Sequence, residues 1–277
     1  MRRRWFLLVQ FQTAAEFVVV DVEVLRDDAP VEGLRQGDFR VFEDGREQPV
    51  TGFGKDDQEL EVILLVDVSD STRLIQESVQ RSAMRAMNAL QFRDRVGVVL
   101  FANDSTLAAA PTWDRLAILR ELAALPLPEG GTEFNRNLVL TARYLAQSAR
   151  PGARRAIVML TDNLGTRSID NTKTRAELWE ADVILSGLLF PNSAYRAGAG
   201  DIRPFADDTG GDVMKYDGTA AQLEALFRNL RRRYTLLYRK PAGVPGATRK
   251  IRVELTAEAK ARAGNVRIRS RRGYIAR

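Results

Sequence analysis

The feature that most constrains the fold is an uninterrupted apolar run at residues 62–66, Val-Ile-Leu-Leu-Val. A strand without polar alternation is buried on both faces, and such strands belong to parallel sheets that helices cover. Comparable runs occur at 95–101, 155–160 and 183–190, with segments of helical periodicity in the intervening sequence. The sequence therefore predicts an α/β fold with a doubly wound, mostly parallel sheet.

The two ends of the chain follow a different pattern, with short strand-like segments separated by turns. These segments lie at 17–24, 39–42, 48–53, 234–238, 249–255 and 265–270. A β tail of this length would have exposed edges if it stood alone. We therefore expect residues 1–58 and 234–277 to pack together as one small flanking β domain, with an α/β domain at 59–233 inserted between them.

Composition excludes several kinds of site. The chain of 277 residues contains no cysteine and no histidine. Disulfides, thiol nucleophiles, histidine metal ligands and Ser-His-Asp triads are therefore excluded. Any bound metal must be a hard cation held by oxygen atoms.

Oxygen-bearing side chains gather at the predicted strand ends. Asp67, Ser69 and Ser71 follow the first buried strand, Asp162 follows the strand at 155–160, and Thr132 precedes a helix. Ligands of open α/β sheets bind at the carboxyl ends of the strands. Three hydroxyls and two carboxylates suit the shell of Mg²⁺, with Mn²⁺ as an alternative and Ca²⁺ less favoured. Taken alone, Ser71 is equally explained as a helix N-cap and Asp67 as a solvated strand end.

Three sequence elements resemble the metal-ion-dependent adhesion site of von Willebrand factor A domains. They are Asp67-Val68-Ser69-Asp70-Ser71, Gly130-Gly131-Thr132 and Thr161-Asp162. The resemblance covers residues 61–233 and implies a Rossmann-like fold. It also implies that Ser69, Ser71 and Thr132 contact the metal, that Asp67 and Asp162 bind it directly or through water, and that a partner's carboxylate completes the shell.

A wider resemblance extends over nearly the whole chain, to the bacterial "VWFA-related" proteins. The matching segments are Val31-Glu32-Gly33-Leu34, Asp38-Phe39, Glu43-Asp44-Gly45, Thr209-Gly210-Gly211 and Arg272-Gly273-Tyr274. Many members carry export signals, which favours an extracytoplasmic location. Residues 1–9 form only a marginal signal, because Gln10 interrupts a short apolar run, so a cytoplasmic location stays open. Asn163 departs from the family pattern, in which glycine is common after the aspartate.

We expect a divalent-cation-dependent protein-binding module and not an enzyme. Its partner would be a protein with an exposed Asp or Glu carboxylate, and the loops at 163–170 and 191–200 would set the specificity. We expect no small-molecule substrate and no membrane span, because no segment is long enough to cross a bilayer.

Two alternative functions remain at the level of sequence. A metal-dependent hydrolase would need a nucleophile or base near the ion, but the chain lacks the Asp-x-Asp pair of aspartyl phosphatases and lacks nucleotide-binding loops. Nucleic-acid binding would use the basic C-terminal region of this chain of net charge +6. A solvated basic face is the alternative explanation of this region's basic residues, which are Arg228, Arg231, Arg232, Arg233, Arg239, Lys240, Arg249, Lys250, Arg252, Arg267, Arg269, Arg271, Arg272 and Arg277.

Overall fold

The computed structural model describes residues 17–55, 58–191, 201–219 and 221–276. The predicted signal or strand at residues 1–9 lies outside these ranges, as does all but Pro191 of the loop at 191–200. None of the helices in the described ranges is long and apolar enough to cross a membrane.

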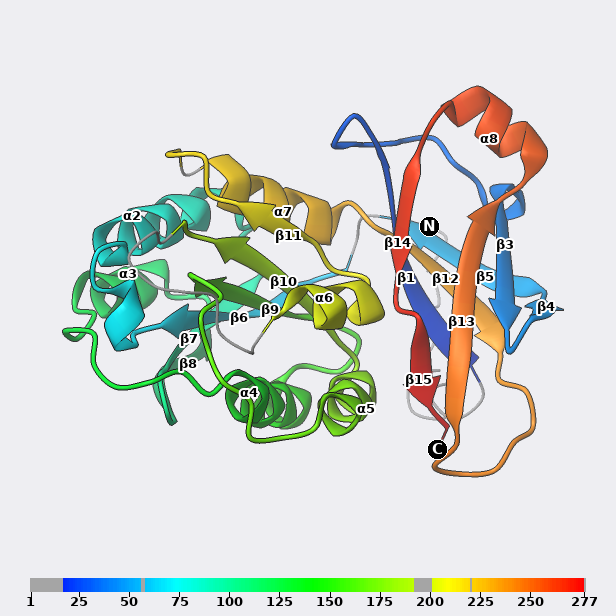
Figure 1. Cartoon of the computed structure of the whole chain (residues 1–277). Helices are drawn as coiled ribbons and strands as arrows, with labels where there is room; N and C mark the ends of the chain where they lie inside the picture. The colour runs from blue at the N-terminus through cyan, green and yellow to red at the C-terminus, as the bar shows by residue number, and fades with distance from the viewer. Residues whose placement is uncertain (1–16, 56–57, 192–200, 220, 277) are drawn as a thin grey trace, which may run out of the picture.

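A six-stranded sheet forms the centre of the α/β part, in the order β11-β10-β9-β6-β7-β8 (Figure 1). Its strands are β6 (Leu60–Asp67), β7 (Arg95–Phe101), β8 (Ser105–Thr112), β9 (Arg154–Thr161), β10 (Val183–Leu189) and β11 (Val213–Lys215). Neighbouring strands pair in parallel, except that β8 runs antiparallel to β7. The predicted α/β fold with a mostly parallel sheet is confirmed.

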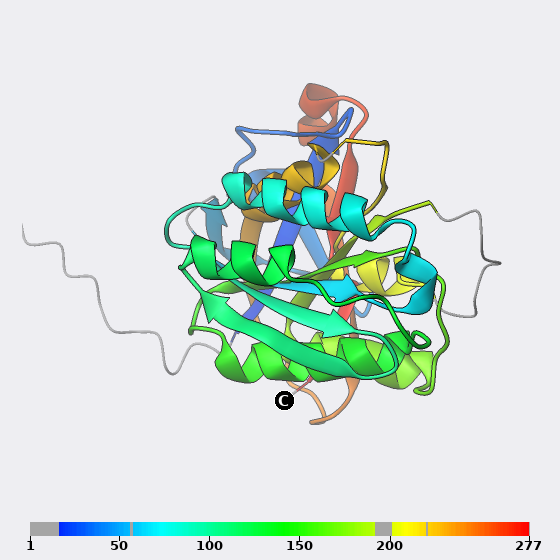
Figure 2. The ribbon, with the colours of Figure 1, turned by 90° about the vertical axis from the view of Figure 1, so that its left-hand side faces the viewer.

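Helices cover both faces of this sheet, as Figure 2 shows with α2 and α3 on one side and α4 on the other. The first face packs against α2 (Gln76–Ala86), α3 (Arg115–Ala123) and α7 (Ala221–Arg231). The second packs against α4 (Phe134–Ser148), α5 (Asn171–Ala181) and α6 (Arg203–Thr209). Leu64 and Val66 of β6 belong to the first apolar cluster and Ile63 and Leu65 to the second. Both faces of β6 are therefore buried, which explains its unbroken apolar sequence.

The two chain ends meet in two further sheets (Figure 1). One has the order β14-β1-β12-β5, with β2 beside β1, and the other has the order β15-β13-β3-β4. These strands are β1 (Phe17–Arg26), β2 (Ala29–Pro30), β3 (Phe39–Glu43), β4 (Arg46–Gln48), β5 (Val50–Lys55), β12 (Tyr234–Arg239), β13 (Thr248–Leu255), β14 (Arg267–Ser270) and β15 (Gly273–Ile275). In the first sheet, β12 from the end of the chain lies antiparallel between β1 and β5 from its beginning.

One apolar cluster joins these two sheets and contains Val20, Val41, Leu236 and Val253. That residues 1–58 and 234–277 form a separate domain, with boundaries at 58 and 233, remains a prediction. Two helices were not foreseen, namely α6 and the short α8 (Ala257–Ala263) between β13 and β14.

An ion pair between Arg154 and Asp21 ties the α/β sheet to the sheet of the chain ends. Two nitrogens of the Arg154 guanidinium donate to the Asp21 carboxylate at 2.8 and 3.0 Å. The same guanidinium donates to the carbonyl of Leu230 at 2.8 Å, and the Thr235 hydroxyl donates to Asp21 at 2.9 Å. Because Arg154 begins β9 and Asp21 lies in β1, this contact crosses between two sheets.

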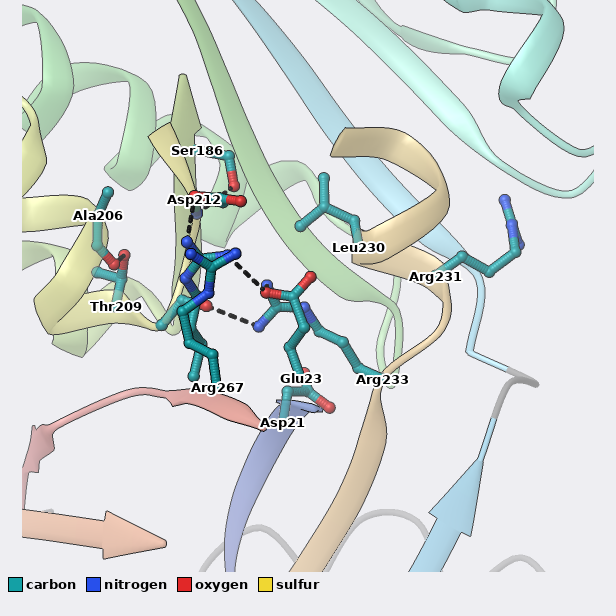
Figure 3. A network of polar contacts seen from close by, with 12 residues as sticks. Asp21, Glu23, Ser186, Ala206, Thr209, Asp212, Leu230, Arg231, Arg233 and Arg267 are labelled. Carbon is teal, nitrogen blue, oxygen red and sulfur yellow. Dashed lines mark hydrogen bonds and ion pairs between the residues drawn. The ribbon is translucent and has the colours of Figure 1, made fainter. Parts of the chain in front are cut away.

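A second group of charges continues this junction (Figure 3). Arg233 and Arg269 both pair with Glu23, at 3.6 and 3.3 Å, and Arg269 also pairs with Asp212 at 2.5 Å. Arg233 donates to the carbonyl of Gly210 at 2.8 Å and has only 1% of its surface exposed. The interpretation of Arg233 as part of a solvated basic face was therefore wrong, because the residue is buried and bonded within the molecule.

Candidate metal centre

The turn after β6 brings three of the predicted site residues together. The backbone N–H and the hydroxyl of Ser69 both donate to Oδ1 of Asp67, at 3.0 and 2.6 Å. The hydroxyls of Ser69 and Ser71 lie 3.3 Å apart. The Thr72 hydroxyl donates to the carbonyl of Ser69 at 2.8 Å, within the short 3₁₀ helix Asp70–Thr72. These local bonds hold the carboxyl and both serine hydroxyls in one tight turn.

The loop that carries Thr132 lies against this turn. The backbone N–H of Asp70 donates to the carbonyl of Gly130, and the N–H of Glu129 donates to the carbonyl of Val68, both at 3.0 Å. The carbonyl of Thr132 in turn accepts from the N–H of Thr166 at 2.7 Å. Backbone bonds of Glu129 and Gly130 therefore hold this loop against the β6 turn, and Thr132 itself is bonded to Thr166.

The end of β9 supplies Asp162 and a further residue to which the sequence analysis gave no role. The hydroxyl of Thr161 donates to Oδ2 of Asp67 at 2.6 Å and so links the ends of β6 and β9. The adjacent Asp162 accepts from the N–H of Leu164 at 3.0 Å, and its charge acts on Asp67. The available signal was the position of Thr161, directly before Asp162 at the end of a buried strand.

Asn163 stands where glycine is common in the family that the sequence resembles, and the backbone conformation at this position explains why either residue fits. Its φ of 63° lies in the left-handed region, which glycine adopts freely and asparagine tolerates. Its side-chain amide donates to Asp201 at 3.1 Å, and its side-chain oxygen accepts from the N–H of Ile202 at 3.2 Å. The asparagine therefore keeps the turn and also anchors the start of α6 beside Asp162.

The electrostatics of the turn favour a bound cation. Burial raises the pKa of Asp67 to about 7, and the neighbouring Asp162 adds to the rise, against the hydrogen bonds from Ser69 and Thr161. The five predicted side chains are all largely buried, with 1% to 9% of their surface exposed. A buried carboxylate without a balancing positive charge is unfavourable, so a cation at this position would stabilise the ionised form.

The side chains at these strand ends have the oxygen chemistry that a hard cation requires. Within the described ranges no group of three or more acidic side chains gathers as a metal cluster. A cation here would therefore depend on the hydroxyls of Ser69, Ser71 and Thr132 as well as on Asp67 and Asp162. Oxygen donors of this kind suit Mg²⁺, which keeps part of its shell for water or another ligand.

Comparison with known proteins identifies the type of domain. Residues 62–165 match the family model described as von Willebrand factor type A domain. The Magnesium-chelatase 60 kDa subunit of Cereibacter sphaeroides is 29% identical over 131 residues. That match spans 46% of this chain and only 23% of the chelatase subunit.

Solved structures show the same fold. The hypothetical protein BatB from Bacteroides thetaiotaomicron is 20% identical with a TM-score of 0.50, over 62% of this chain and 97% of BatB. A von Willebrand factor type A protein from Catenulispora acidiphila is 13% identical with a TM-score of 0.52, over 96% of this chain and 76% of that one. At these identities the likeness concerns the fold alone.

Proposed function

Because the chain contains a von Willebrand factor type A domain, we propose that it is a protein-binding module whose affinity depends on a divalent cation. The observation that carries the proposal is the joining of the β6 and β9 ends around Asp67, with Ser69 on one side and Thr161 on the other. Domains of this type are generally protein-interaction modules.

The site residues would contribute two kinds of ligand to a bound cation. Ser69, Ser71 and Thr132 would contribute neutral oxygens, and Asp67 and Asp162 would contribute the negative charge. Two carboxylates would balance the charge of Mg²⁺ formally. Because the other ligands are neutral hydroxyls, the ion would remain electrophilic toward an anionic ligand. A bound Mg²⁺ would supply a strong electrostatic attraction for one carboxylate of a protein partner in this partly desolvated place.

Binding is better supported than catalysis at this site. The hydroxyls of Ser69 and Ser71 are engaged with Asp67 and with each other. No histidine or cysteine occurs in the sequence to act as base or nucleophile. The match to the chelatase subunit covers too little of that protein to transfer an activity. Non-enzymatic binding therefore stands as our proposal.

Internal pairing of arginines also favours protein binding over nucleic-acid binding. Arg233, Arg269 and Arg271 pair with Glu23, Asp212 and Asp182 within the chain. Guanidiniums used in this way contribute less to a positive surface for phosphates. We therefore propose a protein partner with an exposed Asp or Glu.

Calorimetric titration of Mg²⁺ or Mn²⁺ tests the proposal. We expect saturable binding of one ion per chain to the wild-type protein, and loss of binding in Thr132→Ala and Asp162→Ala with unchanged circular dichroism. Thr106→Ala removes an exposed threonine of β8 and should bind as wild type. Equal affinity in all four proteins would refute the proposed site.

A further inference from the structure

A cavity opens directly beside the candidate metal centre. Its volume is about 360 Å³, and Asp162 forms part of its wall. The apolar part of the wall comes from Leu164, Leu189, Phe190, Pro191 and Tyr216. The volume lies within the range of sites that hold a ligand group, about 300–1,000 Å³.

The walls of this cavity are fixed by the same strand ends that carry the site. The N–H of Phe190 donates to the carbonyl of Thr161 at 2.9 Å, and the N–H of Tyr216 donates to that of Leu189 at 2.8 Å. The rings of Phe190 and Tyr216 pack with their centroids 4.7 Å apart. Because β10 lies beside β9 in the sheet, the cavity continues the sheet edge outward from Asp162.

Two basic side chains also line the cavity. Lys215 is exposed at the end of β11, and Arg203 at the start of α6 keeps 49% of its side chain exposed while it pairs with Asp201. Asp201 balances the charge of Arg203, so Lys215 supplies the positive charge at the rim, and an apolar hollow of this kind complements an apolar side chain with an acidic residue nearby. A cation at the adjacent site would extend the positive potential in the same direction.

We propose that this cavity is a specificity pocket for the protein partner, and that it receives a large aliphatic or aromatic side chain next to the metal-bound acidic residue. This inference rests on the proposed function, because the acidic residue is placed by the metal centre. The partner would be a segment in which Glu or Asp lies within a few residues of Leu, Phe or Trp, with further acidic residues nearby.

Another exposed apolar pair near the site provides a competing surface and hence a control. Leu74 and Leu127 are 75% and 79% exposed. Their two segments are held together by Arg73, which donates to the carbonyl of Pro128, and by Gln76, which donates to that of Pro126. Leu74 follows the β6 turn and Leu127 precedes the loop of Thr132, whereas the cavity lies at the ends of β9 and β10, so the two surfaces can be tested separately.

The test is selection of displayed peptides with one fixed glutamate and randomised flanks, bound in Mg²⁺ and eluted with EDTA. We expect Leu, Phe or Trp to be enriched beside the glutamate. Leu164→Ser and Tyr216→Ser should each lower the affinity for a selected peptide by about tenfold or more. Neither variant should change the affinity for the same peptide with alanine in place of the apolar residue beside the glutamate. Lys215→Glu should weaken only peptides with further acidic residues. Leu74→Ser and Leu127→Ser should bind as wild type.

The pocket would be overturned if the selected glutamate peptides showed no enrichment of apolar residues. It would also be overturned if Leu74→Ser or Leu127→Ser, and not the cavity variants, abolished the preference for an apolar residue. Either result would leave the proposed function intact. A second arm needs no metal. In EDTA, N-acetyl-tryptophanamide should shift the NMR signals of Leu164 and Tyr216, and Leu164→Ser should abolish these shifts. If no peptide binds in a Mg²⁺-dependent way, the proposed function fails. Absence of the NMR shifts in EDTA would overturn the pocket independently of that result.

Discussion

The Thr161 hydroxyl donates a hydrogen bond of 2.6 Å to Oδ2 of Asp67 and so connects the ends of two neighbouring strands. Thr161→Val removes this donor from a buried carboxyl. We expect the free energy of unfolding to fall by about 1–3 kcal/mol, because the buried carboxyl loses a donor and the N–H of Asn163 loses its acceptor. The pKa of Asp67 should also rise further, because hydrogen bonds to the ionised form hold it down.

Urea unfolding and Mn²⁺ titration at about pH 6 and about pH 8 would measure both effects of Thr161→Val. Mn²⁺ affinity should fall more at the lower pH, where a larger share of Asp67 is protonated. Thr161→Ser keeps the hydroxyl and serves as the matched control. Equal Mn²⁺ affinity of the valine and serine variants at both pH values would contradict this role.

The raised pKa of Asp67 predicts an unusual pH dependence for the metal-free protein. The folded-state pKa of about 7 exceeds the unfolded value of about 3.9, so the folded state binds the proton more tightly. Stability in EDTA should therefore decline as the pH rises from about 4 to about 7, by about 1.4 kcal/mol for each pKa unit at most. Asp67→Asn carries no charge and should lose this component of the pH dependence.

Urea unfolding of wild type and Asp67→Asn at several pH values, each with EDTA and with excess Mg²⁺, would test this expectation. Mg²⁺ should restore stability to the wild type above neutral pH and leave Asp67→Asn unchanged, because binding to the folded state stabilises it. Parallel pH profiles of the two proteins in EDTA would show that ionisation of Asp67 does not destabilise the fold.

The Arg154–Asp21 ion pair should be important for stability. The side chain of Arg154 is 1% exposed and that of Asp21 is 19% exposed. Arg154→Met leaves the carboxylate without its cation, and loss of one partner of a buried pair costs about 3–5 kcal/mol. Arg40→Met breaks the exposed pair with Glu47 and should cost about 1 kcal/mol or less. Urea unfolding would compare them, and similar losses would contradict a special role for Arg154.

The same ion pair predicts sensitivity to acid. Burial acts to raise the pKa of Asp21, but the charge and hydrogen bonds of Arg154 outweigh burial and hold the pKa below its usual value. A lowered folded-state pKa contributes stability above the unfolded pKa of about 3.9, and this contribution is lost as the pH falls through the folded value. Asp21→Asn should therefore flatten the stability profile below about pH 4. A profile as steep as that of wild type would contradict this.

Substitution of Gly165 would displace the loop that carries Thr132 without changing any residue of the proposed metal centre. A Cβ at this position would lie 3.0 Å from the carbonyl oxygen of Thr132 and 3.1 Å from the Phe134 ring. Gly165→Ala should lower the free energy of unfolding by about 1–3 kcal/mol and weaken Mn²⁺ binding, because the crowded backbone must shift. Gly37→Ala meets nothing within 4 Å and serves as control. Unchanged Mn²⁺ affinity in Gly165→Ala would indicate that Thr132 does not contribute to metal binding.

The sequence predicts the α/β fold well because its central strand has no exposed face. Every residue of β6 is buried, so the apolar run carries a clear signal. The turn residues Asp67, Ser69 and Ser71 were also predictable, since they are close in sequence. The distant bond from Thr161 was not, because no periodicity specifies which hydroxyl a buried carboxyl will meet.

Other parts of the structure depend on partners that the sequence pattern does not specify. Arg233 lies in a run of basic residues that looks solvated, yet Glu23 and Gly210 bind it at a junction between sheets. The helix α8 had local signals, since the Thr256 hydroxyl caps its start by accepting from the N–H of Ala259, and Gly264 follows its end. The alternation of apolar and polar residues on both sides of α8 favours strands, so these local helix signals do not stand out in the sequence.

Anomalous diffraction from crystals grown with Mn²⁺ would locate the ion directly. We expect one strong peak bounded by the hydroxyl oxygens of Ser69, Ser71 and Thr132, with Asp67 and Asp162 in contact directly or through water. A peak elsewhere, or no peak at a concentration that saturates binding in solution, would contradict a metal centre at the ends of β6 and β9.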